Sequence, residues 1–199
     1  MRRIYLLMFA LMLCFSMANA QVIEGTVLKS WDGASGSIEI PANVTEIAEN
    51  CFYTPAEEDP DTWEVIAEEK SNTNITSVKL NNVKKIGKNA FRGCSNIETI
   101  DAPNVETIEE GAFYGLEKLT ILSLPSIKEL GMNAFEGCNQ IAKIALGSGL
   151  AKMFGNTFKG CKAVSDISVA AGGTYKAAQN AIVSPDKTLV YLAGKAKEK

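Results

Sequence analysis

The chain has 199 residues, of which 46% are hydrophobic and 22% charged, with a formal net charge of −3. This composition is typical of a single folded domain and argues against a disordered chain. The slightly acidic balance leaves no basic stripe for a phosphate backbone, so we expect no nucleic-acid partner. The chain also has no histidine, which removes Ser-His and Cys-His nucleophiles and the usual imidazole metal ligands.

Residues 1–20 have the three parts of a secretory signal peptide. Two arginines are followed by an almost unbroken apolar run over 4–15, and Ala-Asn-Ala at 18–20 provides the small residues that signal peptidase requires. The alternative, an uncleaved membrane anchor, would need about 20 apolar residues. We therefore predict cleavage before Gln21, export to the periplasm, the cell surface or the medium, and no membrane attachment of the mature chain.

A repeat follows a short N-terminal segment, residues 21–37, which we expect to cap the array. The motif at 86–94, Ile-Gly-Lys-Asn-Ala-Phe-Arg-Gly-Cys, recurs at 108–116, 130–138 and 153–161. Its phenylalanines follow one another at steps of 22, 22 and 23 residues. An earlier copy places Phe52 in the same position. We call these five residues the Phe column: Phe52, Phe91, Phe113, Phe135 and Phe158.

Each repeat contains one short strand. In the segment 119–125, Leu122 and Leu124 are two residues apart and are predicted to point inward, whereas Ile121 and Ser123 face solvent. Proline then ends the strand, because it cannot donate a ladder hydrogen bond. A single unit cannot bury its apolar side chains, but stacked units bury a continuous core.

The pattern Ile-Gly-x-x-Ala-Phe-x-Gly-Cys-x-x-Ile-x-x-Ile-x-x-Pro resembles the BspA-type leucine-rich repeats of secreted bacterial proteins, over residues 38–169. The resemblance implies a β-rich solenoid: a curved parallel-β leucine-rich repeat of about five coils of 22–23 residues, with β caps at both ends. It also implies a surface or secreted protein, since some members are adhesins. The fold follows from the resemblance, but a particular ligand does not.

An acidic insertion of about residues 53–74 interrupts the array. Asp61-Thr62-Trp63-Glu64 has the form of a capping box and predicts a short helix through about Lys70. One interpretation makes the insertion a cation site or a binding loop anchored by Trp63. The other, which we favour, is a solvated loop with Trp63 and Val65 packed against the solenoid.

The cysteines occupy repeat columns that accept leucine or alanine elsewhere, so we expect them to behave as small buried hydrophobes. A disulfide between Cys138 and Cys161 is the less favoured alternative. Without a CxxC spacing, a zinc site has no support. Residues 170–199 are predicted to form a β-hairpin cap, with strands at 181–183 and 189–192, followed by a charged tail.

The outward strand positions are the candidate partner-binding residues, together with Trp63: Thr99, Asp101, Ile121, Ser123 and Lys143. This mixed polar surface suits a protein partner, and Ile121 is its only large apolar residue. We expect a secreted or cell-surface binding protein that mediates protein or adhesion contacts as a monomer. The alternative is a small accessory protein without a strong ligand. With no convergent catalytic cluster, we expect no enzyme activity, cofactor or metal.

Overall fold

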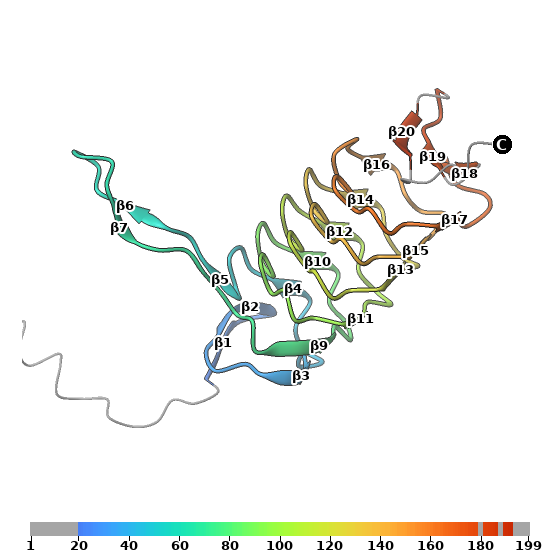
Figure 1. Cartoon of the computed structure of the whole chain (residues 1–199). Helices are drawn as coiled ribbons and strands as arrows, with labels where there is room; N and C mark the ends of the chain where they lie inside the picture. Colours follow the sequence, from blue (N-terminus) through green and yellow to red (C-terminus); the bar gives the residue numbers. More distant parts are fainter. Residues whose placement is uncertain (1–19, 179–180, 187–188, 193–199) are drawn as a thin grey trace, which may run out of the picture.

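The computed structural model describes residues 20–178, 181–186 and 189–192, and these form a β-solenoid (Figure 1). Most of the predicted signal peptide and the charged tail lie outside the described residues. Within the described part, all regular elements are β-strands. No helix in this part has the length and hydropathy needed to cross a bilayer. The predicted solenoid is therefore confirmed.

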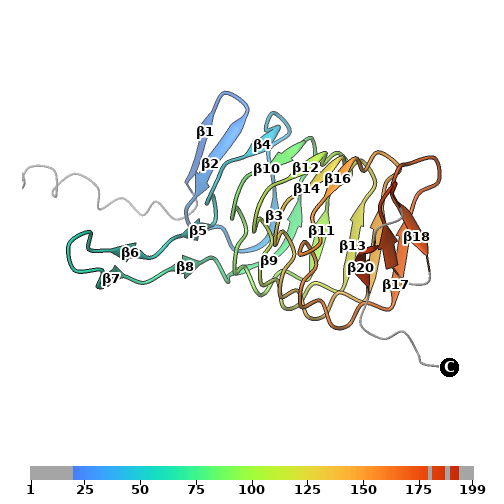
Figure 2. The same cartoon turned by 90° about the horizontal axis from the view of Figure 1, so that it is seen from above.

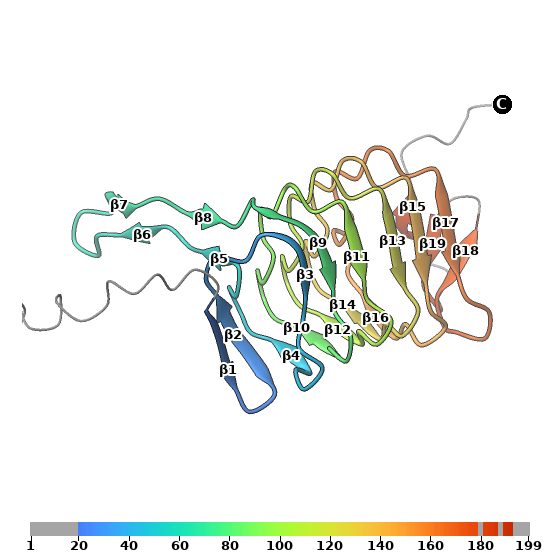
Figure 3. The same cartoon turned by 90° about the horizontal axis from the view of Figure 1, so that it is seen from below.

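One side of the solenoid is built from strands of three to five residues in two parallel sheets, ordered β11-β9-β3 and β13-β15-β17. The strands on this side are β3 (Gly36–Glu39), β9 (Ile75–Lys79), β11 (Thr99–Asp101), β13 (Ile121–Leu124), β15 (Lys143–Leu146) and β17 (Asp166–Val169). These are six strands for the predicted five coils, since β17 begins a further turn that the C-terminal cap completes (Figure 3).

The opposite side is a seven-stranded sheet in which parallel two-residue strands follow an N-terminal antiparallel hairpin (Figure 2). Its strands are β1 (Gln21–Glu24), β2 (Val27–Trp31), β4 (Glu46–Ile47), β10 (Lys85–Ile86), β12 (Thr107–Ile108), β14 (Glu129–Leu130) and β16 (Lys152–Met153). Because β2 pairs in parallel with β4, the hairpin covers the first coil.

The Phe column forms a stack of rings through the core. Neighbouring rings lie 4.6–5.4 Å apart between centroids, at interplanar angles of 8–20°. Trp31 lies 6.4 Å from Phe52 at one end, and Tyr191 lies 5.4 Å from Phe158 at the other. Both capping rings are tilted, so the two β caps close the aromatic stack as well as the sheets.

Two residues from the Phe, the chain turns through left-handed backbone: before it in the first four coils and after it in the last four. The position before it is asparagine or glycine, with φ of 52–61° at Asn50, Asn89, Gly111 and Asn133. The position after it is glycine, with φ of 67–79° at Gly93, Gly115, Gly137 and Gly160. These are the residues that adopt this conformation at least cost. We call the second position the glycine corner.

In the first coil Thr54 replaces this glycine, and the chain leaves the solenoid as an antiparallel ribbon. We call this ribbon, residues 53–71, the arm. At its base β5 (Tyr53–Thr54) pairs with β8 (Lys70–Ser71), and farther out β6 (Glu57–Glu58) pairs with β7 (Val65–Ala67). All three views show β6 and β7 projecting away from the coils (Figures 1–3).

The helix predicted from Asp61 is wrong. Asp59 instead closes a turn at the arm tip: its carboxylate accepts hydrogen bonds from the amides of Asp61 and Thr62, and its carbonyl accepts one from the amide of Trp63. The β-branched pair Val65 and Ile66 then favours the strand. The predicted packing of the insertion against the solenoid is also wrong, since the Trp63 and Val65 side chains are 76% and 51% exposed.

The C-terminal cap is a three-stranded antiparallel sheet of β18 (Lys176–Ala178), β19 (Ala181–Val183) and β20 (Leu189–Leu192). Ile182 of β19 is fully buried, and Tyr175, just before β18, is 8% exposed. The predicted hairpin between β19 and β20 is present, although Lys187 of its turn lies outside the described residues. The cap seals the last apolar layer of the solenoid.

Candidate functional site

The longer-stranded side presents exposed or half-buried side chains in two columns, which we call the strand face. The first column comprises Ser37, Ser77, Thr99, Ile121, Lys143 and Asp166, and the second Glu39, Lys79, Asp101, Ser123, Ala145 and Ser168. Five predicted partner-binding residues, Thr99, Asp101, Ile121, Ser123 and Lys143, lie on neighbouring strands of this face (Figure 3). The ladder fixes their backbone, whereas the alternate residues Leu122 and Leu124 are buried as predicted.

Four of the five charged residues on the strand face form ion pairs between coils. Lys79 Nζ lies 2.9 Å from Glu39 Oε1, and Lys143 Nζ lies 3.2 Å from Asp166 Oδ2. The hydrogen bond to Glu39 raises the pKa of Lys79, and hydrogen bonds from Asn81 and Lys79 lower the pKa of Glu39. These groups are solvent-exposed, so the pairs add little stability. Lys79 and Glu39 stay ionised.

Ile121 is the one large apolar side chain exposed on the described strand face, at 59%. It stands opposite Lys143 in the ladder between β13 and β15. The pair Lys143–Asp166 lies toward the C-terminal end of the face, and Lys79–Glu39 toward the N-terminal end. An apolar centre between polar groups is the usual arrangement of a protein-binding patch.

Trp63 is not brought to the strand face. It lies in the turn between β6 and β7 at the tip of the arm. These two strands are remote from β11 and β13 in every view (Figures 1–3). The backbone φ of Trp63 is 60°, an unusual value for a bulky residue. Val65 and Ile66 beside it are 51% and 60% exposed. The described residues include six exposed large apolar side chains, and these three occupy four consecutive positions.

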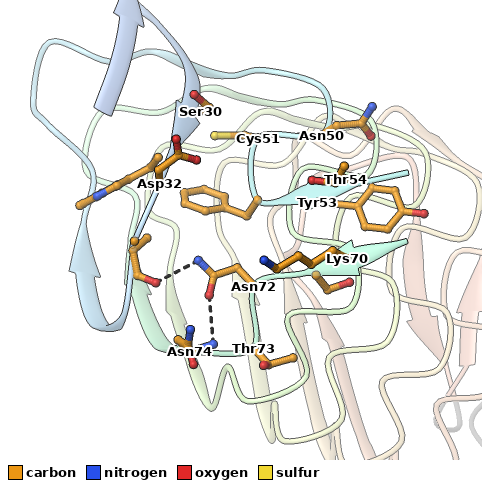
Figure 4. A pocket seen from close by; sticks show the side chains of 15 residues that line it. Ser30, Asp32, Asn50, Cys51, Tyr53, Thr54, Lys70, Asn72, Thr73 and Asn74 are labelled. Atoms are coloured by element: carbon orange, nitrogen blue, oxygen red, sulfur yellow. Dashed lines mark hydrogen bonds between the residues drawn. The ribbon is translucent and has the colours of Figure 1, made fainter. Parts of the chain in front are cut away.

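A pocket of about 480 Å³ lies at the base of the arm, between the N-terminal turn and β8 (Figure 4). The Asn72 amide nitrogen donates to the carbonyl of Ala34, and the Asn72 amide oxygen accepts from the amide of Asn74. Tyr53 Oη donates to Glu69 at 2.6 Å, and burial, followed by this bond, raises the pKa of Tyr53. The Asn72 amide therefore fastens the chain just after the arm to the N-terminal turn, and the Tyr53–Glu69 bond joins the two strands of the arm at its base.

The sequence interpretation missed a second apolar spot, on the side of the two-residue strands. Met132 is 41% exposed and lines a pocket of about 400 Å³ together with Phe154. Lys152 Nζ lies over the Phe154 ring, 5.2 Å from its centroid. The repeat contained a signal for it, since the corresponding positions of the two preceding coils are the charged residues Lys88 and Glu110.

The four described cysteines are buried free thiols, so the structure contains no Cys138–Cys161 disulfide. Burial is the main cause that raises the pKa of Cys51 and of Cys94 to about 12, and it raises that of Cys138. The Cys138 and Cys161 thiols each donate to a carbonyl at 3.2 Å. Such thiols are poor nucleophiles. Among the described residues, no group of three or more acidic or thiol side chains is arranged to hold a metal ion.

Stacked parallel coils, a continuous Phe column and a repeated glycine corner define this chain as a leucine-rich-repeat solenoid. The family follows from comparison with known sequences. The family profile described as "BspA type Leucine rich repeat region (6 copies)" matches residues 68–181, more than half of the chain. The chain therefore belongs to the BspA-type leucine-rich-repeat family, as its motif predicted. No match was found among curated protein sequences.

Three solved structures are similar to this chain. The leucine-rich repeat protein of T. pallidum superposes with a TM-score of 0.62 at 17% identity, over 77% of this chain and 69% of that one. A leucine-rich repeat protein from Bacteroides ovatus superposes with a TM-score of 0.55 at 21% identity, over 76% of this chain and 39% of that one. The pneumococcal vaccine antigen PcpA superposes with a TM-score of 0.51 at 19% identity, over 88% of this chain and 54% of that one. This chain thus spans well under two thirds of the latter two, and at these identities the likeness shows the fold alone.

Proposed function

We propose that this chain is a secreted or cell-surface protein that binds another protein through the strand face, without enzymatic activity. The observation behind this proposal is the exposed Ile121 among paired polar side chains on a backbone that the ladder holds rigid. A rigid, exposed, mixed surface loses little conformational entropy when a partner binds. We further propose a signal over residues 1–20, caps at 21–37 and 170–199, the solenoid at 38–169, and a monomer in solution.

The experiment compares two single substitutions in the mature chain, probed against an array of extracellular proteins and glycans. Ile121→Asp introduces a charge at the centre of the strand face, and we expect at least a tenfold loss of affinity, as for a central interface residue. Met132→Asp is the matched control, because it changes an exposed apolar side chain on the opposite side. Equal affinities of the two variants, or no protein bound by the parent, would refute the proposal.

A second candidate is a small accessory protein of the same architecture with no strong ligand. The inter-coil ion pairs favour it, because charges that already have partners have less to gain from a new one. Cell fractionation with surface proteolysis separates the two candidates in part. A chain that stays in the periplasm, inaccessible to added protease, has no extracellular ligand.

A further inference from the structure

We propose that the arm is a second docking element, whose tip residues Trp63, Val65 and Ile66 insert into an apolar cleft with a basic rim on a partner protein. This surface is separate from the strand face. The proposal therefore holds or fails independently of the function proposed for Ile121.

The apolar residues at the tip of the arm are exposed to solvent. The side chains of Trp63, Val65 and Ile66 are 76%, 51% and 60% exposed, and β6 and β7 project beyond the coils. Elsewhere in the described chain, large apolar side chains are exposed only singly, at Val22, Ile121 and Met132. Scattered apolar residues need no explanation on a protein surface, whereas a contiguous group of them marks a contact site.

The fold does not require tryptophan at the tip of the arm. The turn is closed by backbone groups and by the carboxylate of Asp59, and Trp63 takes part through its amide. Its φ of 60° is a conformation that glycine adopts freely and that is strained for a bulky residue. Glycine would suit this turn better, so the indole ring has no explanation in the stability of the arm.

The base of the arm is anchored to the next coil, which holds the tip in place before a partner arrives. The Tyr53 hydroxyl donates to Glu69 within the arm, whereas the Arg92 guanidinium of the next coil lies 5.5 Å from the Tyr53 ring centroid and 4.2 Å from that of Tyr114. Ser71 packs closely against Gly93 of the next coil: a Cβ added at Gly93 would lie 2.2 Å from the Ser71 hydroxyl oxygen. A fixed base lowers the entropy lost on docking.

The negative charge of the arm indicates the chemistry of the partner. Seven of the 23 acidic residues of the chain lie between Glu57 and Glu69, and Lys70 is the one basic residue of the arm, so the arm carries −6. Hydrogen bonds from the amides of Thr62 and Asp61 lower the pKa of Asp59 at the tip and keep it ionised.

Without residues 1–20 the chain has a formal charge of −5, so everything outside the arm sums to +1. The arm thus holds the excess negative charge of the molecule. An anionic membrane or a nucleic acid would repel it, whereas a lysine- and arginine-lined cleft would attract it. The remainder of the chain is almost neutral, which makes a different, basic protein a better match than a second copy of this chain.

The probe is a random dodecapeptide library displayed on phage, panned on the mature chain and counter-selected on its Trp63→Gly variant. Enriched peptides should combine aromatic or aliphatic residues with several lysines or arginines. A synthetic peptide of the winning sequence should bind the mature chain in calorimetric titrations, and its affinity should fall several-fold between 50 and 300 mM NaCl.

Trp63→Gly should weaken this peptide at least tenfold and leave the thermal midpoint equal to or above that of the parent. Glu58→Lys should weaken it several-fold. The strand-face variant Ile121→Asp is the matched control and should stay within twofold of the parent, which separates this proposal from the proposed function.

Four results would overturn the proposal. These are no peptide enriched on the parent over Trp63→Gly, enriched peptides without basic residues, Trp63-dependent binding to vesicles of phosphatidylcholine and phosphatidylglycerol, and Trp63-dependent dimerisation.

Discussion

Replacing Phe113 by alanine tests the physical basis of the solenoid. Its ring is 1% exposed and lies 5.2 Å from the ring of Phe91 and 5.3 Å from that of Phe135, between centroids. Removing a buried phenylalanine costs about 3–5 kcal/mol, because the ring's burial is lost and the cavity does not close fully. Within that figure, each ring pair accounts for about 0.5–1.5 kcal/mol. Since a domain of this size unfolds at a cost of about 5–15 kcal/mol, the variant should fold with a much smaller margin.

Equilibrium urea unfolding, followed by circular dichroism, measures this loss. Phe113→Leu is the matched control, because leucine refills most of the volume without restoring the two ring contacts. We expect leucine to cost less than half of what alanine costs. A Phe113→Ala variant that unfolds within about 1 kcal/mol of the parent would refute the argument that the Phe column holds the coils together.

Further predictions concern a glycine and the buried thiols. A Cβ at Gly131 would lie 2.6 Å from the carbonyl carbon of Glu109, so Gly131→Ala should cost about 1–3 kcal/mol by crowding the preceding coil. Gly155→Ala should cost less, because a Cβ there would lie 3.5 Å from its nearest neighbour, the carbonyl oxygen of Val190. The same urea titration measures both, and equal losses would contradict the close approach. Cys51 and Cys94 have folded-state pKa values of about 12 against about 8.5 in the unfolded chain. The contribution of these thiols to the free energy of unfolding should therefore be fully present below pH 8.5. As the pH rises to about 12, it should fall by about 1.4 kcal/mol per pH unit for each thiol. Urea midpoints at pH 8, 9.5 and 10.5 should show this loss, with a smaller slope for Cys51→Ala; a flat profile would be inconsistent with buried thiols.

The parts of the fold that repeat could be predicted from the sequence. The Phe column and the inward Leu122 and Leu124 recur at a fixed step, and only a stack of coils buries all of them together. The free thiols were predictable for the same reason, since Leu116 occupies the column of Cys138. Repetition supplies several independent observations of each buried position.

The arm could not be predicted in this way, because it occurs once. The local signal at Asp61 favoured a helix, but pairing between β6 and β7 outweighed it. The exposure of Trp63 depends on where the ribbon points, and a local pattern contains no such information. The β-branched pair Val65 and Ile66 was the available indication of a strand.

For the candidate site, the sequence identified which side chains share the strand face, because alternation within a strand determines them. It did not identify the pairing of Lys143 with Asp166, which requires the register between coils. The apolar spot at Met132 was visible as a departure from a charged column, yet its pocket with Phe154 depends on a residue 22 positions away.

The glycine corner has a consequence for how such a molecule can be altered. Tyr53 pairs with Ser71, so the two ends of the arm leave and re-enter the coil side by side, and the solenoid is insensitive to the length of chain between them. The same corner occurs in four later coils, at Gly93, Gly115, Gly137 and Gly160. A foreign peptide could be grafted at any of these corners, and neighbouring grafting positions would be about 4.8 Å apart along the solenoid.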